Sequence, residues 1–318
     1  MNYPEESRTN RESSRQSGDS SFIIETLVDT YRMSLLIVTG IVALGTAALL
    51  GALLVVCVGP SHLSAPLREP EVFKRRLYNV APFLVVLVLV LGINKGLHDV
   101  SQDISWVVGQ NVTGVLYGIE GEFLIALQNA FPEQAAFYFS FIYVFGYVAL
   151  LVFPMIAYLF SDSLHNLKVT LIAYAANYGI GVLMYTLFIA YGPRNVMDGL
   201  LSQPMYEVYP EVMFLTSAVN TNTNVFPSLH TSLSVTAMIL ALMSHREFPR
   251  WTPFALLLGT SVVISTMYLG IHWLTDVVVG VALGALAVYI GEYVVNRADR
   301  SGLLNDLDDD QLSFTVSD

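Results

Sequence analysis

Apolar residues gather along the chain into seven runs separated by polar segments. Each run approaches or exceeds the roughly 20 residues that a helix needs to cross the hydrocarbon core of a bilayer. The first run is too long and too far from the N-terminus for a cleaved signal peptide, so we interpret it as a retained span. The pattern therefore predicts seven membrane-spanning helices, at residues 33–58, 77–95, 136–160, 169–191, 229–245, 253–271 and 274–295.

Polar residues dominate both ends of the chain. Residues 1–25 are rich in Ser, Arg, Glu and Asn, and residues 299–318 are acidic, so we expect a disordered tail at each end. Residues 26–298 are left as a single membrane domain. The predicted fold class is therefore all-α, a polytopic membrane helical bundle.

Composition indicates a membrane protein and argues against one class of partner, nucleic acid. Hydrophobic residues make up 54% of the chain and charged residues 13%, which is not the composition of a soluble globular protein. The formal net charge of −11 argues against a nucleic-acid partner and leaves membrane lipids as the expected surroundings. The single cysteine, Cys57, lies in the first apolar run and offers neither a disulfide pair nor a cysteine metal site.

Lysine and arginine predict the orientation of the spans. The segments that follow the first, third, fifth and seventh runs carry most of these residues, which places them in the cytoplasm. The opposite segments, 96–135 and 192–228, contain one basic residue, Arg194. We therefore expect a multi-pass protein of the cell membrane with a cytoplasmic C-terminus. His230 and His272 then lie on the extracytoplasmic side together with Arg194.

The extracytoplasmic segment 97–135 is long for a connection between two spans. Its apolar and polar residues alternate in a helix-like way, which predicts one or two amphipathic helices at the membrane surface. Such helices would cover the extracytoplasmic end of the bundle. A simple surface connector is the alternative.

The stretch "FPSLHTSLS" at 226–234 begins the fifth apolar run. Ser228 is a favoured helix N-cap, and the backbone amides that follow it have no acceptor within the helix. Together with the helix dipole these amides bind anions, and phosphate is the usual guest. His230 in the first turn would then be placed to give a proton to a leaving oxygen. The alternative is a capped helix with an interfacial histidine.

Two further groups are predicted to reach the same membrane face. In "STMYLGIHWLTD", 265–276, His272 and Asp276 are four residues apart, so a carboxylate would fix the imidazole tautomer as a nucleophile or general base requires. Arg194 in "YGPRN" would clamp phosphate oxygens. The alternatives are a hydrogen bond that locks two helices and an ordinary interfacial arginine.

These residues resemble the motifs of the type 2 phosphatidic acid phosphatase (PAP2) superfamily, K-x6-R-P, P-S-G-H and S-R-x5-H-x3-D. "PSLH" at 227–230 matches the second motif at three of its four positions. Ser265, His272 and Asp276 match the third with its spacing. The resemblance covers roughly residues 78–295 and implies a six-helix core preceded by one extra N-terminal helix.

The sequence departs from the family pattern at two cation positions. Thr266 stands at the arginine of the third motif, and no lysine precedes Arg194 at the spacing of the first motif. Leu229 replaces the glycine of the second motif. The "FPSLH" form is similar to the branch that contains the inositol phosphorylceramide synthases, which transfer a phospho-headgroup between lipids.

The resemblance implies a phosphatase that acts on a phospholipid or polyprenyl (di)phosphate without a metal or other cofactor. His272 would attack phosphorus and become a phosphohistidine, Asp276 would orient it, and His230 would protonate the leaving oxygen. A headgroup transferase and a catalytically degenerate, non-enzymatic membrane protein are the alternatives. The groups expected to hold the phosphate are Arg194, Ser228, Leu229 through its amide, and Ser265.

Overall fold

The computed structural model describes residues 33–210 and 223–301. The predicted N-terminal tail, 1–25, lies outside the described residues, as do residues 302–318 of the predicted C-terminal tail. The last helix runs to Arg300, so it continues two residues into the segment that the sequence assigned to that tail.

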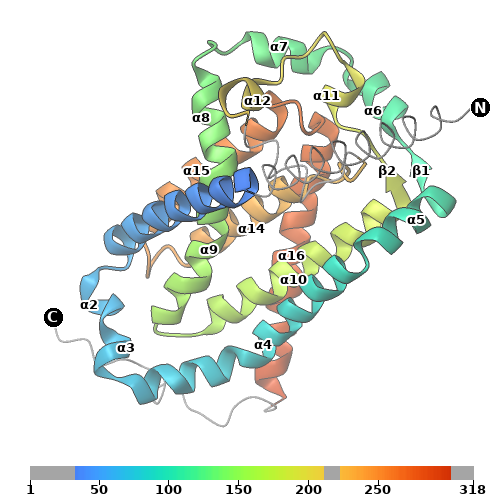
Figure 1. Cartoon of the computed structure of the whole chain (residues 1–318). Helices are drawn as coiled ribbons and strands as arrows, with labels where there is room; N and C mark the ends of the chain where they lie inside the picture. Colours follow the sequence, from blue (N-terminus) through green and yellow to red (C-terminus); the bar gives the residue numbers. More distant parts are fainter. Residues whose placement is uncertain (1–32, 211–222, 302–318) are drawn as a thin grey trace, which may run out of the picture.

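Helices make up nearly all of the described chain, and every apolar run predicted to span the membrane is helical over most of its length (Figure 1). This confirms the predicted all-α polytopic membrane bundle. The third run is divided into α8, the π-helix η1, α9 and the 3-10 helix η2. The fourth run, 169–191, leaves the helix after Leu187 and continues into a short strand. The bounds of the long elements are Met33–Cys57, α4 Pro70–Gly96, α8 Ala135–Phe141, η1 Ile142–Gly146, α9 Tyr147–Ala157, η2 Tyr158–Phe160, α10 His165–Leu187, α14 Leu229–Met243, α15 Trp251–Tyr268 and α16 Leu274–Arg300.

Six of these apolar stretches in the described residues are long enough to cross a membrane, whereas α14 has only 15 residues. At about 1.5 Å per residue it measures roughly 22 Å, which is shorter than a hydrocarbon core of about 30 Å. The neighbouring α16 has 27 residues. At least one end of α14 is therefore recessed below the membrane surface.

Short elements connect the long helices at both ends of the bundle (Figure 1). The segment 97–135, in which one or two amphipathic helices were predicted, holds three short helices and a strand. Its strand β1 pairs in parallel with β2, so that Gln110 lies opposite Phe188. The bounds of the connecting elements are α2 Pro60–Leu63, α3 Ala65–Arg68, α5 His98–Val108, β1 Gln110–Asn111, α6 Thr113–Glu120, α7 Phe123–Asn129, β2 Phe188–Ile189, α11 Pro193–Val196 and α12 Pro204–Val208.

Helices α10, α14 and α16 pack against one another and form the centre of the bundle. Two glycines of α16 let its backbone approach α14 directly. A Cβ at Gly280 would lie 2.7 Å from the Ser228 carbonyl oxygen, and a Cβ at Gly284 would lie 2.5 Å from that of Ser232. Because any side chain there would force the helices apart, these glycines hold the beginnings of α14 and α16 together.

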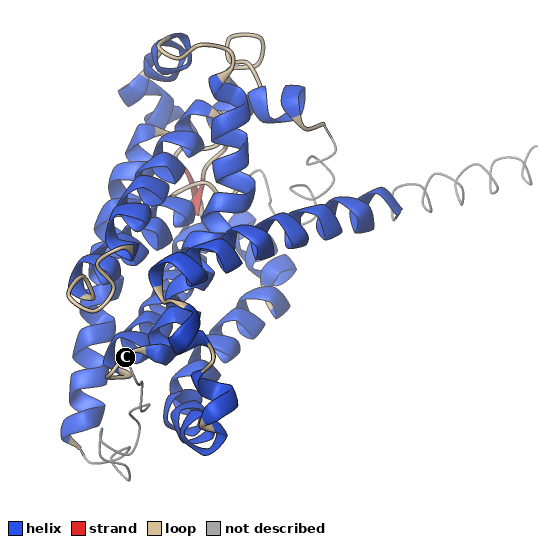
Figure 2. Cartoon of the chain, turned by 90° about the vertical axis from the view of Figure 1, so that its left-hand side faces the viewer, coloured by secondary structure: helices blue, strands red, loops and turns tan. Residues whose placement is uncertain are grey.

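The N-terminal helix Met33–Cys57 is attached to the bundle along only part of its length. Figure 2 shows its beginning running out from the other helices, while its C-terminal half lies against them. Leu53 and Cys57 are buried there. Gly45 is a point of close approach, because a Cβ at this position would lie 2.6 Å from the Phe145 ring.

Candidate active site

The beginning of α14 has the capping geometry that the sequence predicts. Ser228 is fully buried at the N-cap, and its Oγ accepts a hydrogen bond of 3.2 Å from the Thr231 backbone N–H. The peptide bond between Phe226 and Pro227 is cis. The Ser228 N–H donates to the Asp276 backbone carbonyl at 3.1 Å, which ties this turn directly to the first turn of α16.

The turn between α15 and α16 positions His272. The Thr266 carbonyl accepts hydrogen bonds from the backbone N–H groups of Ile271 at 3.0 Å and His272 at 3.1 Å. Gly270 has φ of +67°, a conformation that favours glycine, and it reverses the chain between the two helices. His272 is consequently buried at the start of α16, close to the beginning of α14.

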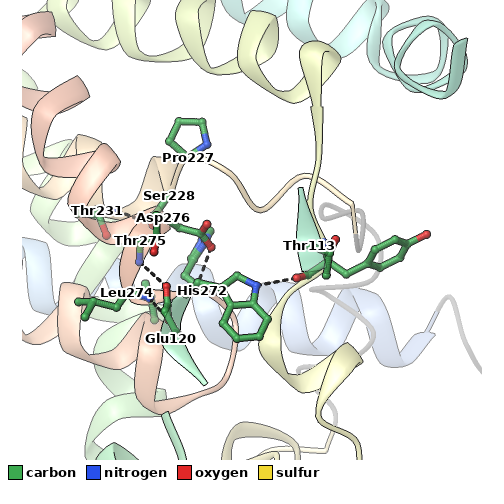
Figure 3. Close-up of polar contacts among 12 residues, drawn as sticks. Thr113, Glu120, Pro227, Ser228, Thr231, His272, Leu274, Thr275 and Asp276 are labelled. Atoms are coloured by element: carbon green, nitrogen blue, oxygen red, sulfur yellow. Dashed lines mark hydrogen bonds and ion pairs between the residues drawn. The ribbon is translucent and has the colours of Figure 1, made fainter. Parts of the chain in front are cut away.

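His272 and Asp276 form the predicted pair. His272 Nδ1 lies 3.5 Å from Asp276 Oδ2, and the same oxygen accepts a 2.8 Å hydrogen bond from the Trp273 backbone N–H (Figure 3). Catalytic hydrogen bonds are often long before substrate binds and shorten as charge develops. Nδ1 faces the carboxylate, so a reaction at His272 would use the other imidazole nitrogen, Nε2.

Burial sets the charge of His272. Removal from water, with a smaller contribution from the positive charge of Arg194, lowers the pKa of this imidazole to about 3, although a hydrogen bond to the Val225 backbone opposes the shift. The imidazole is therefore neutral at physiological pH. A neutral imidazole retains the lone pair that a nucleophile needs.

His230 lies across from His272, with 5.7 Å between the ring centroids. Two tyrosines pack on the His230 ring, Tyr143 at 4.9 Å and Tyr147 at 4.6 Å between centroids. Both come from the third span, four residues apart along η1 and the start of α9. Single π-helical turns of this kind occur frequently at functional sites.

Arg194 is brought to the histidines by the turn that follows α10 and β2. Its backbone N–H donates to the Gly270 carbonyl at 3.0 Å, which fastens α11 onto the turn that carries His272. The guanidinium lies over the Tyr206 ring, with Cζ 5.1 Å from the centroid. The structure thus brings together four of the residues singled out from the sequence, His230, His272, Asp276 and Arg194.

The other predicted phosphate ligands are already engaged within the fold. The Ser228 hydroxyl caps α14, and the buried Ser265 donates its hydroxyl to the Val262 carbonyl at 2.7 Å. The Leu229 side chain fills the space above Gly181, where a Cβ would lie 2.7 Å from Leu229 Cδ2. The leucine at the motif's glycine position is therefore accommodated by a glycine on α10.

Glu120 is a member of this site that sequence reasoning missed. Its two carboxylate oxygens accept hydrogen bonds from the backbone N–H groups of Leu274 at 2.7 Å and Thr275 at 2.6 Å (Figure 3). Glu120 ends α6, within the segment 97–135 that connects α4 to the third span. It supplies the acceptors that the first turn of α16 lacks.

Tyr185 is a second residue that the sequence did not reveal. Its hydroxyl donates to the Pro227 carbonyl at 3.1 Å. The hydroxyl thus braces the turn that starts α14. The sequence gives no sign of this contact, because 42 residues separate Tyr185 from Pro227.

Comparison with known proteins agrees with this geometry. Residues 182–300 match the PAP2 superfamily. The matched region contains Arg194, His230, His272 and Asp276, and it begins within α10. Members of the PAP2 superfamily are generally phosphatases or phosphotransferases, so the match suggests this class of activity. The first three spans lie outside the matched region.

One curated protein is similar over a longer stretch. An uncharacterized protein of Methanocaldococcus jannaschii is 30% identical over 168 residues, which cover 51% of this chain and 63% of that protein. The chain therefore spans less than two thirds of the relative it matches. No solved structure matches the chain.

Proposed function

We propose that this protein is a membrane-embedded lipid phosphate phosphatase that forms a phosphohistidine at His272. The observation that carries the proposal is the buried His272–Asp276 pair, with Nδ1 and Oδ2 3.5 Å apart, facing His230 across 5.7 Å between ring centroids. The substrate class we propose is a phospholipid or polyprenyl (di)phosphate. If the recessed end of the short α14 is its beginning, the reacting groups lie close to the depth of a lipid headgroup, which supports a lipid substrate.

The reaction proceeds in two steps at one phosphorus atom. His272 Nε2 attacks phosphorus, the bond between phosphorus and the leaving oxygen breaks, and His230 donates a proton to that oxygen. Asp276 stabilises the positive charge that develops on the imidazole. In the second step His230 takes a proton from water, the water oxygen attacks phosphorus, and the P–N bond breaks to release phosphate and free His272.

The test is phosphate release by the purified protein in detergent from phosphatidic acid and polyprenyl phosphates, with a chelator present. We expect release by wild type, loss by several orders of magnitude in His272→Ala, and loss of about 10²–10⁴-fold in His230→Ala. His62→Ala is the matched control, because His62 lies in α2 at the other end of the bundle. Equal rates in wild type and His272→Ala would refute the proposal.

A headgroup transferase is the second candidate, and the charge of the site favours it. Arg194 is the only Lys or Arg in segments 96–135 and 192–228. A single cation neutralises a phosphodiester, which carries one negative charge, more fully than a phosphomonoester dianion. Transfer of a labelled headgroup from a phospholipid to an added alcohol, in the absence of phosphate release, would select this candidate.

We propose that the protein lies in the cell membrane with the site on the extracytoplasmic face and the C-terminus in the cytoplasm. The distribution of Lys and Arg supports this orientation. In a Cys57→Ser background, an impermeant maleimide added to intact cells should label Leu200→Cys and spare Ser301→Cys. Both positions are exposed, so the reverse labelling pattern would invert the proposed orientation.

A further inference from the structure

Tyr147 packs against His230 at the edge of the site. Its ring centroid lies 4.6 Å from that of His230, and it begins α9 immediately after the π-helix η1. Tyr147 lies outside residues 182–300, the part that matches the PAP2 superfamily. The family match therefore assigns no role to Tyr147.

The hydroxyl of Tyr147 differs from those of three other tyrosines in the bundle. The Tyr158 hydroxyl bonds to Ser244 at 2.8 Å, that of Tyr174 to the Leu151 carbonyl at 3.1 Å, and that of Tyr185 to the Pro227 carbonyl at 3.1 Å. The Tyr147 hydroxyl forms no hydrogen bond to the residues that the structure describes, and the side chain is only partly buried. A hydroxyl without a protein partner beside His230 is available to donate to a bound ligand.

The site also needs donors that the family motifs do not provide here. Thr266 stands in place of a cation and turns its hydroxyl to the Val263 carbonyl at 2.8 Å. Ser228 and Ser265 are engaged in their own helices. Arg194 is therefore the one charged phosphate donor among the family's motif positions, and a neutral donor is required beside it.

We infer that Tyr147 is a phosphate-binding residue whose hydroxyl donates a hydrogen bond to a non-bridging oxygen of the substrate's phosphoryl group. The inference rests on the proposed function and adds a neutral donor beside His230. Tyr147 keeps its proton throughout, while its ring supports His230. A hydrogen bond to a charged acceptor contributes about 1.5–3 kcal/mol, which corresponds to roughly 10–150-fold in affinity or rate.

Tyr147→Phe tests the inference because it removes the hydroxyl and retains the ring that packs on His230. The first readout is the affinity of the full-length protein in detergent for inorganic phosphate, measured by calorimetry. We expect at least 10-fold weaker binding than wild type. Tyr174→Phe is the matched control, since it removes a buried hydroxyl that bonds to the Leu151 carbonyl, and it should bind phosphate like wild type.

The second readout is kcat/KM for the lipid phosphate that wild type hydrolyses, which should fall in parallel with the affinity. Unchanged phosphate binding in Tyr147→Phe, or no binding by wild type, would overturn the inference. Weakened binding without any turnover by wild type would uphold the inference and refute the phosphatase proposal. Normal turnover by wild type, together with unchanged phosphate binding in Tyr147→Phe, would refute the inference and leave the phosphatase proposal standing.

Discussion

Two helices begin at this site, and the groups around their first turns differ in charge. The first turn of α16 is covered by carboxylates, because Glu120 accepts from the amides of Leu274 and Thr275 and Asp276 accepts from that of Trp273. The first turn of α14 is met by hydroxyls, from Ser228 at the N-cap and from Tyr185 at the preceding turn. Both helix starts satisfy backbone groups, but only one gains negative charge.

The difference assigns separate tasks to the two helices. A helix N-terminus carries about half a positive charge, which carboxylates neutralise and hydroxyls do not. In the proposed mechanism a phosphate is therefore repelled from the first turn of α16 and attracted toward the start of α14, where His230 lies. In the same mechanism the α16 side would supply the nucleophile His272, and the α14 side would supply the proton donor His230 and an anion-binding helix start.

The largest expected effect comes from the charge that orients the nucleophile. Asp276→Asn keeps an oxygen that can accept from Trp273 but removes the charge that stabilises the His272 imidazolium. We expect kcat to fall by roughly 10³–10⁴-fold, as for carboxylate–histidine pairs in other nucleophilic enzymes. Steady-state kinetics with the lipid phosphate as substrate measures this fall in kcat. A loss of less than about 10-fold would show that His272 does not depend on this carboxylate.

The second effect concerns Glu120, the carboxylate from α6 that accepts hydrogen bonds from the first turn of α16. Glu120→Ala removes two short hydrogen bonds to the amides of Leu274 and Thr275 and leaves an uncovered anion site beside His272. We expect kcat to fall by about 10–100-fold, because charged hydrogen bonds contribute about 1.5–3 kcal/mol each and part of this loss is recovered by water.

Glu120→Gln is the matched control for that prediction. The amide oxygen can still accept from one backbone N–H, so this variant should retain more activity than Glu120→Ala while losing the charge. If phosphate then acts as a stronger inhibitor, the carboxylate does exclude anions from α16. Equal inhibition in wild type and both variants would remove the contrast between the two helix starts.

The third effect tests how α14 is seated. Gly181→Ala would place a Cβ 2.7 Å from Leu229 Cδ2, so the leucine must shift, and overpacking of this kind costs about 1–3 kcal/mol. We expect a lower thermal unfolding midpoint in detergent, restored in part by Leu229→Ala in the double variant. Strictly additive effects of the two substitutions would argue against the contact.

The smallest effect concerns the His272 imidazole, which we expect not to take up a proton between pH 7 and pH 5. The pKa of His272 is lowered by burial to about 3, below the roughly 6.5 of an unfolded chain. Its contribution to stability is therefore complete above pH 6.5 and is lost as the pH falls from 6.5 toward 3. The NMR signals of this ring, assigned with His272→Gln, should not shift between pH 7 and pH 5. A midpoint near pH 6.5 would contradict the burial of the imidazole.

The sequence predicts the helices better than it predicts their lengths. Apolar runs located all seven, because the bilayer requires continuous hydrophobic segments. The run at 229–245 gives an α14 that ends at Met243, and the run at 77–95 gives an α4 that starts at Pro70. Helix ends are set by caps and tertiary contacts, which hydrophobicity does not report.

The sequence likewise revealed some groups of the candidate site and missed others. Spacing within one turn revealed the His272–Asp276 pair, and the cap signal revealed the start of α14. Glu120 and Tyr147 were missed because they reach the site from other spans, and Glu120 is 154 residues from Leu274. Ser265 matched the family motif, but its hydroxyl bonds within its own helix. Motif spacing locates groups on one element, whereas contacts between elements depend on the fold.

The most direct test of the account is to trap the phosphoenzyme. Wild type is mixed with a lipid phosphate labelled with ³²P at the transferred phosphorus, quenched within milliseconds and digested. The account predicts a label that is stable in alkali and lost in acid, as a phosphoramidate is, on the peptide that contains His272, and its absence in His272→Ala. Turnover with no such label, or with the label on another residue, would contradict His272 as the nucleophile.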